Sequence, residues 1–120
     1  MTPLHYAAMF DYFNICKLIV ERIQDKNPPD NNGFTPLHIA AKRGYLNVCK
    51  LLIDRSEEKN PGDKNKKTPL HLAAKYGHLD ACKLIIANVN NKHPLDWKNR
   101  TPKDFADKHN FGDVSQLFQS

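Results

Sequence analysis

The tetrapeptide Thr-Pro-Leu-His occupies residues 2–5, 35–38 and 68–71, and a fourth copy, Thr-Pro-Lys-Asp, occupies residues 101–104. The interval between successive copies is constant. Other residues recur in the same register: Cys16, Cys49 and Cys82; Pro28, Pro61 and Pro94; Asp30, Asp63 and Asp96. A fixed period without gaps predicts a stack of equivalent units. We therefore expect one domain, residues 1–120, made of repeats at 2–34, 35–67 and 68–100 and a C-terminal capping repeat at 101–120.

Each unit is predicted to hold two helices. Thr35 suits an N-cap, and Pro36 suits the first helical position, where its missing N–H costs nothing. Gly44 and Gly77 are expected to end the first helix in the left-handed conformation. The second helix is apolar around most of its circumference, as a helix between two neighbours in a stack requires; its apolar residues are Leu46, Val48, Cys49, Leu51, Leu52 and Ile53.

An extended turn follows each second helix. Residues 30–33, Asp-Asn-Asn-Gly, predict the tip of a hairpin. Lys66 and Asn99 replace Gly33 in the later copies, and Asp11 and Asn110 replace the helix-ending glycine in the outer copies. The turns at Lys66 and Asn99 are therefore expected to be more strained or of another type.

The chain resembles ankyrin repeats along essentially its whole length. The resemblance rests on the 33-residue period, on three copies of Thr-Pro-Leu-His-x-Ala-Ala and on second helices such as Val-Cys-Lys-Leu-Leu-Ile at 48–53. The usual Gly-Ala-Asp after the second helix is missing, so the ends of these helices are not specified by the motif. The resemblance implies an all-α repeat solenoid of paired antiparallel helices with β-hairpin-like turns. It also implies a concave face that binds other proteins without catalysis.

The histidines His5, His38 and His71 allow two interpretations, a metal or catalytic set and a structural joint. Catalytic groups converge on one point, whereas neighbouring helical layers lie about 8–10 Å apart. The register therefore favours imidazoles that bond backbone or threonine groups and tie one hairpin to the next. The same spacing argues against a zinc site or a disulfide among the cysteines, which we expect to be small buried residues.

No motif of an enzyme, a metal site or a cofactor site is present in the sequence, so we expect none of the three. Asn27 and Asn60 are interpreted as turn-stabilising, although some ankyrin proteins are hydroxylated at this position. No apolar run approaches about 18 residues, so no membrane span is expected. Residues 1–5 do not resemble a secretory signal. The odd count of three cysteines predicts free thiols and a reducing location, cytoplasmic or nuclear.

The family's variable contact positions lie at the hairpin tips, before each threonine and at the end of the first helix. None of them is acidic in this chain, which carries a net charge of +5. We call their cationic and aromatic members the concave face: Phe10, Phe34, Lys42, Arg43, Lys64, Lys67, Lys75, Tyr76, Trp97, Lys98, Arg100 and Lys108. Aromatic and arginine residues are enriched at interaction hot spots. This composition predicts binding of an acidic segment of a partner protein, with Trp97, Tyr76 and Phe34 as anchors.

Two alternatives stay open. A basic, aromatic face also fits nucleic acid, for which affinity falls steeply with salt. The chain could instead be a stacking fragment of a longer ankyrin protein or a homodimer, because the first copy offers an uncapped apolar surface; its residues are Met1, Met9, Phe10, Tyr12 and Phe13. The last copy is expected to be a polar C-terminal cap, with outward residues Lys103, Asp104, Asp107, Lys108, Ser115, Gln116 and Gln119.

Overall fold

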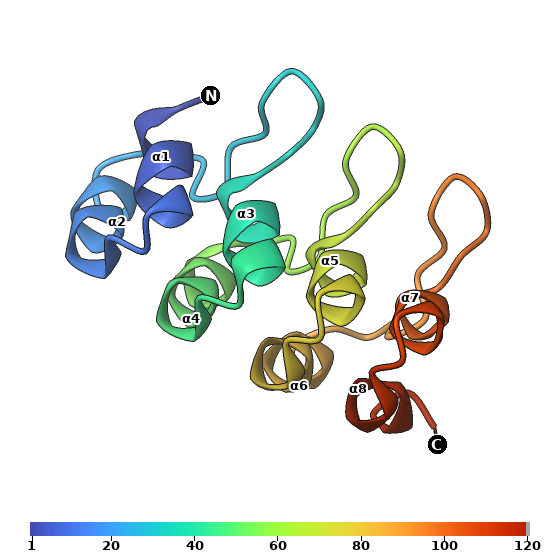
Figure 1. Cartoon of the computed structure of the whole chain (residues 1–120). Helices are drawn as coiled ribbons and strands as arrows, with labels where there is room; N and C mark the ends of the chain where they lie inside the picture. The colour runs from blue at the N-terminus through green and yellow to red at the C-terminus, as the bar shows by residue number, and fades with distance from the viewer. Residues whose placement is uncertain (120) are drawn as a thin grey trace.

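A computed structural model describes residues 1–119 as four helix pairs stacked in a row (Figure 1). The first helices of the pairs form one layer and the second helices form the other, and three long hairpins project from the first layer. The first layer contains α1 (Pro3–Met9), α3 (Pro36–Arg43), α5 (Pro69–Lys75) and α7 (Pro102–Lys108). The second contains α2 (Phe13–Val20), α4 (Leu46–Arg55), α6 (Leu79–Ala87) and α8 (Gly112–Gln116).

The predicted all-α repeat solenoid is confirmed, because residues 1–119 form helices and turns but no strand. The Cα trace extends 39 Å along its longest axis and 25 and 23 Å along the others. Consecutive pairs pack through both layers, so each pair is covered by its neighbours in the chain. A stack of this kind presents one hairpin edge along its length.

Every first helix begins at the threonine that the motif predicts. The N-cap side chain of Thr35 accepts a hydrogen bond from the amide of His38, and Pro36 follows it as the first helical residue. The other N-cap threonines also accept a hydrogen bond from the amide of the third helical residue and are followed by proline: Thr2, Thr68 and Thr101. In the fourth copy the third helical residue is Asp104, whose Oδ2 accepts from the Thr101 amide at 2.9 Å. The capping interaction at the start of the helix is therefore kept although the histidine is replaced.

The left-handed turns also follow the sequence. Gly44 has φ 72°, and a Cβ built on it would lie 2.4 Å from Nδ1 of His78, so both conformation and space favour glycine. Lys66 and Asn99 have φ of 60° and 59°, close to the 75° of Gly33. These hairpins therefore keep the left-handed conformation of the glycine copy, at some conformational cost.

The core is a continuous row of apolar side chains between the two layers. Cys16, Cys49 and Cys82 are fully buried in it and are free thiols, as predicted. Burial raises the pKa of Cys16 to about 11 and the pKa values of Cys49 and Cys82 to about 12. The thiols are therefore neutral and act as small packing groups.

In the first two repeats, where the Gly-Ala-Asp motif is missing, a lysine caps the end of the second helix. Nζ of Lys26 donates to the carbonyls of Val20, at 2.5 Å, and Ile23. Nζ of Lys59 donates in the same way to the carbonyls of Ile53, at 2.5 Å, and Ser56. A cation at a helix C-terminus satisfies free carbonyls and complements the helix dipole. This cap was not predicted from the sequence, although the two lysines lie in the same register of successive repeats.

Candidate interaction face

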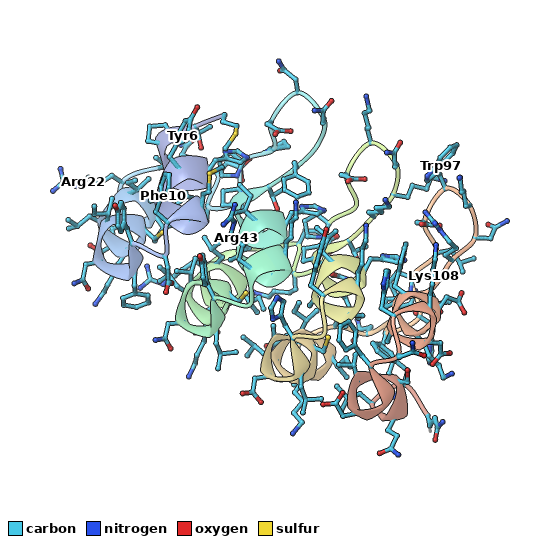
Figure 2. The ribbon with its side chains drawn as sticks, viewed as in Figure 1. Tyr6, Phe10, Arg22, Arg43, Trp97 and Lys108 are labelled. Carbon is cyan, nitrogen blue, oxygen red and sulfur yellow. The ribbon has the colours of Figure 1, made fainter. Side chains whose placement is uncertain are left out.

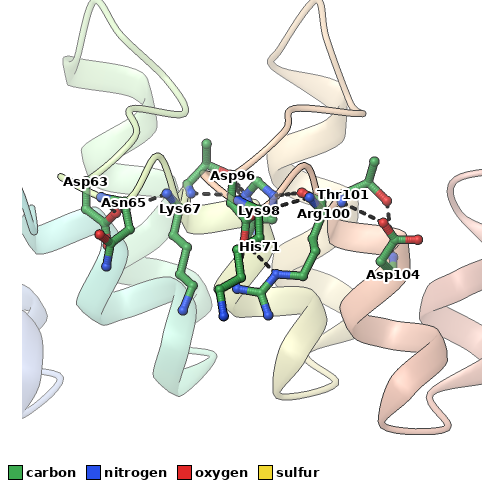
Figure 3. Close-up of polar contacts among 10 residues, drawn as sticks. Asp63, Asn65, Lys67, His71, Asp96, Lys98, Arg100, Thr101 and Asp104 are labelled. Carbon is green, nitrogen blue, oxygen red and sulfur yellow. Dashed lines mark hydrogen bonds and ion pairs between the residues drawn. The ribbon is translucent and has the colours of Figure 1, made fainter.

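Each motif histidine joins the start of one helix to the next hairpin. Nδ1 of His38 accepts from the Thr35 amide at 3.1 Å, and its Nε2 bonds the Lys67 carbonyl at 2.7 Å. His71 repeats the pattern, with Nε2 placed 2.8 Å from the Arg100 carbonyl (Figure 3). Because Nδ1 accepts from an amide N–H, the neutral ring carries its proton on Nε2. The predicted structural joint is confirmed, and both ring nitrogens are occupied.

The joints work in the neutral form of the imidazole. Burial lowers the pKa values of His38 and His71, and this outweighs the opposing effect of the hydrogen bonds to the backbone carbonyls. A charged ring would carry a proton on Nδ1, where the threonine amide already points its own. The joints are therefore intact at neutral pH and weaken when the rings are protonated.

An aspartate shapes each hairpin tip. Oδ1 of Asp63 accepts from the amides of Asn65 at 2.8 Å and Lys67 at 3.0 Å (Figure 3). Asp30 and Asp96 hold the same two positions of their own hairpins. Neighbouring tips are also joined, because the Trp97 amide donates to the Asn65 carbonyl at 2.9 Å and the Lys64 amide to the Asn32 carbonyl at 2.9 Å. The tips therefore form one connected edge.

Arg100 is fixed in place from two sides. Its Nε and one terminal nitrogen each lie 2.9 Å from Oδ2 of Asp96, which is 2% exposed. Its guanidinium lies 4.6 Å from the ring centroid of Phe105, and Nζ of Lys67 lies 5.8 Å from the same centroid. Although burial alone raises the pKa of Asp96, hydrogen bonds from the amides of Arg100 and Lys98 and from the guanidinium hold it below its ordinary value. The role of Phe105 was not predicted from the sequence.

The predicted aromatic anchors differ in their surroundings. Tyr76 is 42% exposed, and Nζ of Lys75 and of Lys42 lie 5.5 and 5.8 Å from its ring centroid. Trp97 is 58% exposed at a hairpin tip, with Nζ of Lys98 5.0 Å from the ring (Figure 2). Phe34 is half-buried and stacks on His38 at 4.9 Å. Only Tyr76 and Trp97 therefore combine exposure with flanking cations.

The cations of the concave face are mostly without acidic partners. Lys42, Arg43, Lys64, Lys98 and Lys108 are exposed, and Lys67, Lys75 and Arg100 are half-buried. Within residues 1–119, Arg100 is the one member of this set that forms a salt bridge. Three of the other seven cations, Lys42, Lys75 and Lys98, lie beside the two exposed aromatic rings. Together the cations and rings make a surface complementary to anionic groups.

Comparison with known families agrees with this architecture. A family model for ankyrin repeats (3 copies) matches residues 1–63 and 57–118. The chain belongs to the ankyrin repeat family. Ankyrin repeats generally serve as protein–protein interaction modules and not as enzymes. No curated protein sequence matches the chain. None of the helices within residues 1–119 has the length and apolarity needed to cross a bilayer.

The N-terminal end of the ankyrin stack exposes a broad apolar surface. Met1, Phe10, Tyr12 and Phe13 are exposed as predicted, whereas Met9 is half-buried and packs against the core. Further exposed members of this surface were not predicted from the sequence: Tyr6, Ile15 and Leu18. They were missed because their counterparts in later repeats are covered by the repeat before them. A groove in this surface is lined by Met1, Pro3, Tyr6, Ala7, Phe10, Tyr12, Ile15 and Ile19.

The C-terminal end of the ankyrin stack carries polar groups on its outside. Lys103 forms an ion pair with Asp107 at 2.8 Å. Ser115, however, is buried, so its predicted outward placement is wrong. It takes the place of the core cysteine, and its hydroxyl donates to Oδ1 of Asp107 at 2.5 Å. A serine fits this site because a carboxylate of the preceding helix accepts a hydrogen bond from its hydroxyl.

Proposed function

We propose that this ankyrin domain binds an acidic segment of a partner protein on its concave face. The observation that carries the proposal is the group of cations without acidic partners around exposed Tyr76 and Trp97. Exposed aromatic residues supply contact area at low entropy cost, and the cations supply electrostatic complementarity. Arg100, already fixed by Asp96 and Phe105, would lose little further freedom on binding.

Nucleic acid is the alternative occupant of the same face. The family's general role in protein binding favours an acidic polypeptide over a phosphate backbone. The two differ in salt dependence, because phosphate contacts release condensed counterions and affinity falls with a steep slope against salt. Binding through aromatic anchors keeps much of its affinity as salt is raised.

An affinity pulldown with the intact chain, followed by titration of the captured partner, tests the proposal. Replacing both Tyr76 and Trp97 by alanine is expected to weaken binding by about tenfold or more. The matched control is Tyr12→Ala, which removes an exposed aromatic ring outside the concave face. Unchanged affinity in the Tyr76→Ala, Trp97→Ala variant would rule out these anchors. Capture of nucleic acid alone would favour the alternative.

Self-association through the N-terminal surface is a second candidate function. The exposed apolar side chains of α1 and α2 line one groove, and large patches of this kind mark interaction sites. At the opposite end, α7 and α8 carry no exposed large apolar side chain within residues 1–119, so two copies would meet through the same surface. Sedimentation that gives a monomer at high concentration would remove this candidate.

We also propose a reducing location for this chain, in the cytoplasm or the nucleus. The support is the three buried free thiols, none of which is paired. A fluorescent fusion of the natural protein, imaged in its own cells, would check the location directly. A signal from the secretory pathway would contradict it.

A further inference from the structure

Three lysines of the concave face stand in one register. Lys42, Lys75 and Lys108 each end or nearly end a first-layer helix, in α3, α5 and α7, and recur at the interval of the repeats. Lys42 and Lys108 are exposed and Lys75 is half-buried. Lys42 and Lys75 approach the same Tyr76 ring, at 5.8 and 5.5 Å, so the first two are neighbours across one aromatic side chain. We call these residues the lysine row.

The stack determines the spacing of the lysine row. Packed neighbouring helices lie about 8–10 Å apart, so the row presents one cation per step of that size along the molecule. A trace 39 Å long that holds four pairs agrees with this step. None of the three lysines has a salt-bridge partner among residues 1–119. The row is therefore a ladder of regularly spaced, unpaired positive charges.

This step distinguishes between the conformations of a bound segment. A polyproline II helix has three residues per turn and rises about 3.1 Å per residue, so every third side chain returns to one face after about 9 Å. Side chains on one face of a β-strand recur after about 6.6 Å. An α-helix turns its side chains to one face about every 5.4 Å. The polyproline II period fits the lysine row with one anion per lysine.

Two further features favour this conformation. Its backbone carbonyls make no internal hydrogen bonds, so the donors of Lys64, Lys98 and the Trp97 indole at the hairpin tips could bond them. Aromatic-lined grooves recognise such segments because they lose little entropy on binding. Tyr76 and Trp97 supply the exposed rings.

We propose that the lysine row binds a polyproline II-like segment with an acidic residue at every third position. The inference rests on the proposed function, since it specifies the acidic segment that the concave face takes. Each carboxylate pairs with one lysine, and the two intervening residues face the hairpin tips or solvent. The spacing of the acidic residues, and not their number alone, determines affinity.

The second layer offers a matched control. Lys17, Lys50 and Lys83 lie in register on α2, α4 and α6, and all three are exposed. Unlike the lysine row, Lys17 and Lys50 each precede an acidic residue by four positions, Glu21 and Asp54 respectively. Replacing the three lysines of either set by glutamate changes the net charge of the protein by the same amount. Non-specific attraction would respond to both sets, whereas a site on the concave face responds to one.

The test uses labelled peptides of about twelve residues, roughly the length of the stack in this conformation. All have the same composition and number of glutamates, placed at every third position, at every second position or in one block. Fluorescence anisotropy with the intact chain is expected to show the every-third peptide binding about five- to tenfold tighter than the others. Replacing the whole lysine row by glutamate should abolish this preference, and the Lys17, Lys50 and Lys83 reversal should retain it.

The outcomes separate the two proposals. Equal binding of all three peptides, or tightest binding of the every-second or block peptide, overturns the inference and leaves the acidic partner standing. If none of the three peptides binds, both the inference and the proposed function are contradicted. An equal effect of the two reversals also overturns the inference. Circular dichroism shows whether each variant is folded, and the single Lys75→Gln variant gives a milder test if the triple reversal unfolds.

Discussion

The two ends of the stack start alike and finish differently. α1 and α7 both begin at a threonine followed by proline, yet the first pair exposes rings such as Phe10 whereas the last buries Phe118. Tyr6 and Phe105 occupy the same register position; Tyr6 is exposed and Phe105 is buried under the preceding hairpin. Local helix signals therefore do not determine burial. A neighbouring repeat does.

The largest expected effect on the free energy of unfolding is the loss of the Phe118 ring, compared with the loss of the Phe10 ring. Phe118→Ala removes a ring that is 3% exposed and should lower the free energy of unfolding by about 3–5 kcal/mol in a urea titration. Phe10→Ala removes a ring that is 58% exposed and should change it by about 0.5 kcal/mol or less.

Protein concentration sharpens this comparison. If the N-terminal surface self-associates, Phe10→Ala should become more destabilising as concentration rises, because association stabilises the folded state by mass action. A large loss in Phe10→Ala at high dilution would contradict the description of this ring as largely exposed.

A second comparison sets the histidine joints against the fourth copy, where Asp104 replaces the imidazole. Burial lowers the folded-state pKa values of His38 and His71, so the unfolded chain binds protons first as pH falls. Their contribution to stability is complete above the unfolded pKa of about 6.5 and is lost as pH drops below it. The melting temperature should therefore fall between about pH 7.5 and pH 5.5.

The control for this prediction is the double variant His38→Gln, His71→Gln. Glutamine at the third helical position can keep the capping interaction without titrating. Its melting temperature should be nearly flat across the same pH range. An equal slope in the variant and the parent chain would show that other groups cause the pH dependence.

The smallest expected effect lies at the junction with the last repeat. Oδ1 of Asn27 and of Asn60 accepts from the amides of Leu37 and Leu70, each at 3.0 Å, which supports the turn-stabilising interpretation. The third copy has His93 at this position, and the corresponding amide belongs to Lys103. His93→Asn should add the hydrogen bond and raise the free energy of unfolding by about 1 kcal/mol, measured in urea.

The reverse change, Asn60→His, provides the matched control. It should lose a similar amount, because it leaves the Leu70 amide without its side-chain acceptor. No change in either variant would mean that this hydrogen bond does not hold neighbouring repeats together.

The sequence predicted the features that depend on neighbours along the chain. Thr35, Pro36 and Gly44 specify a helix start and end within one turn, so their roles could be read directly. The period predicted the histidine joint as well, because its two partners recur in every copy. Lys26 and Lys59 share one register and make local contacts, but their cap was not predicted, because a lysine after a helix does not by itself indicate that its side chain turns back to the helix end.

The sequence alone determined the repeat period, the helix boundaries at each threonine, and the residue types that face the hairpin edge. Only the tertiary structure decided which of those residues are exposed and which are held by contacts with other side chains. It stacks half-buried Phe34 on His38, fixes Arg100 between Asp96 and Phe105, and turns Ser115 inward to Asp107. The physical reason is that these side chains are close in sequence, but whether they contact one another or face solvent depends on their rotamers and on the packing around them, which residue type does not specify.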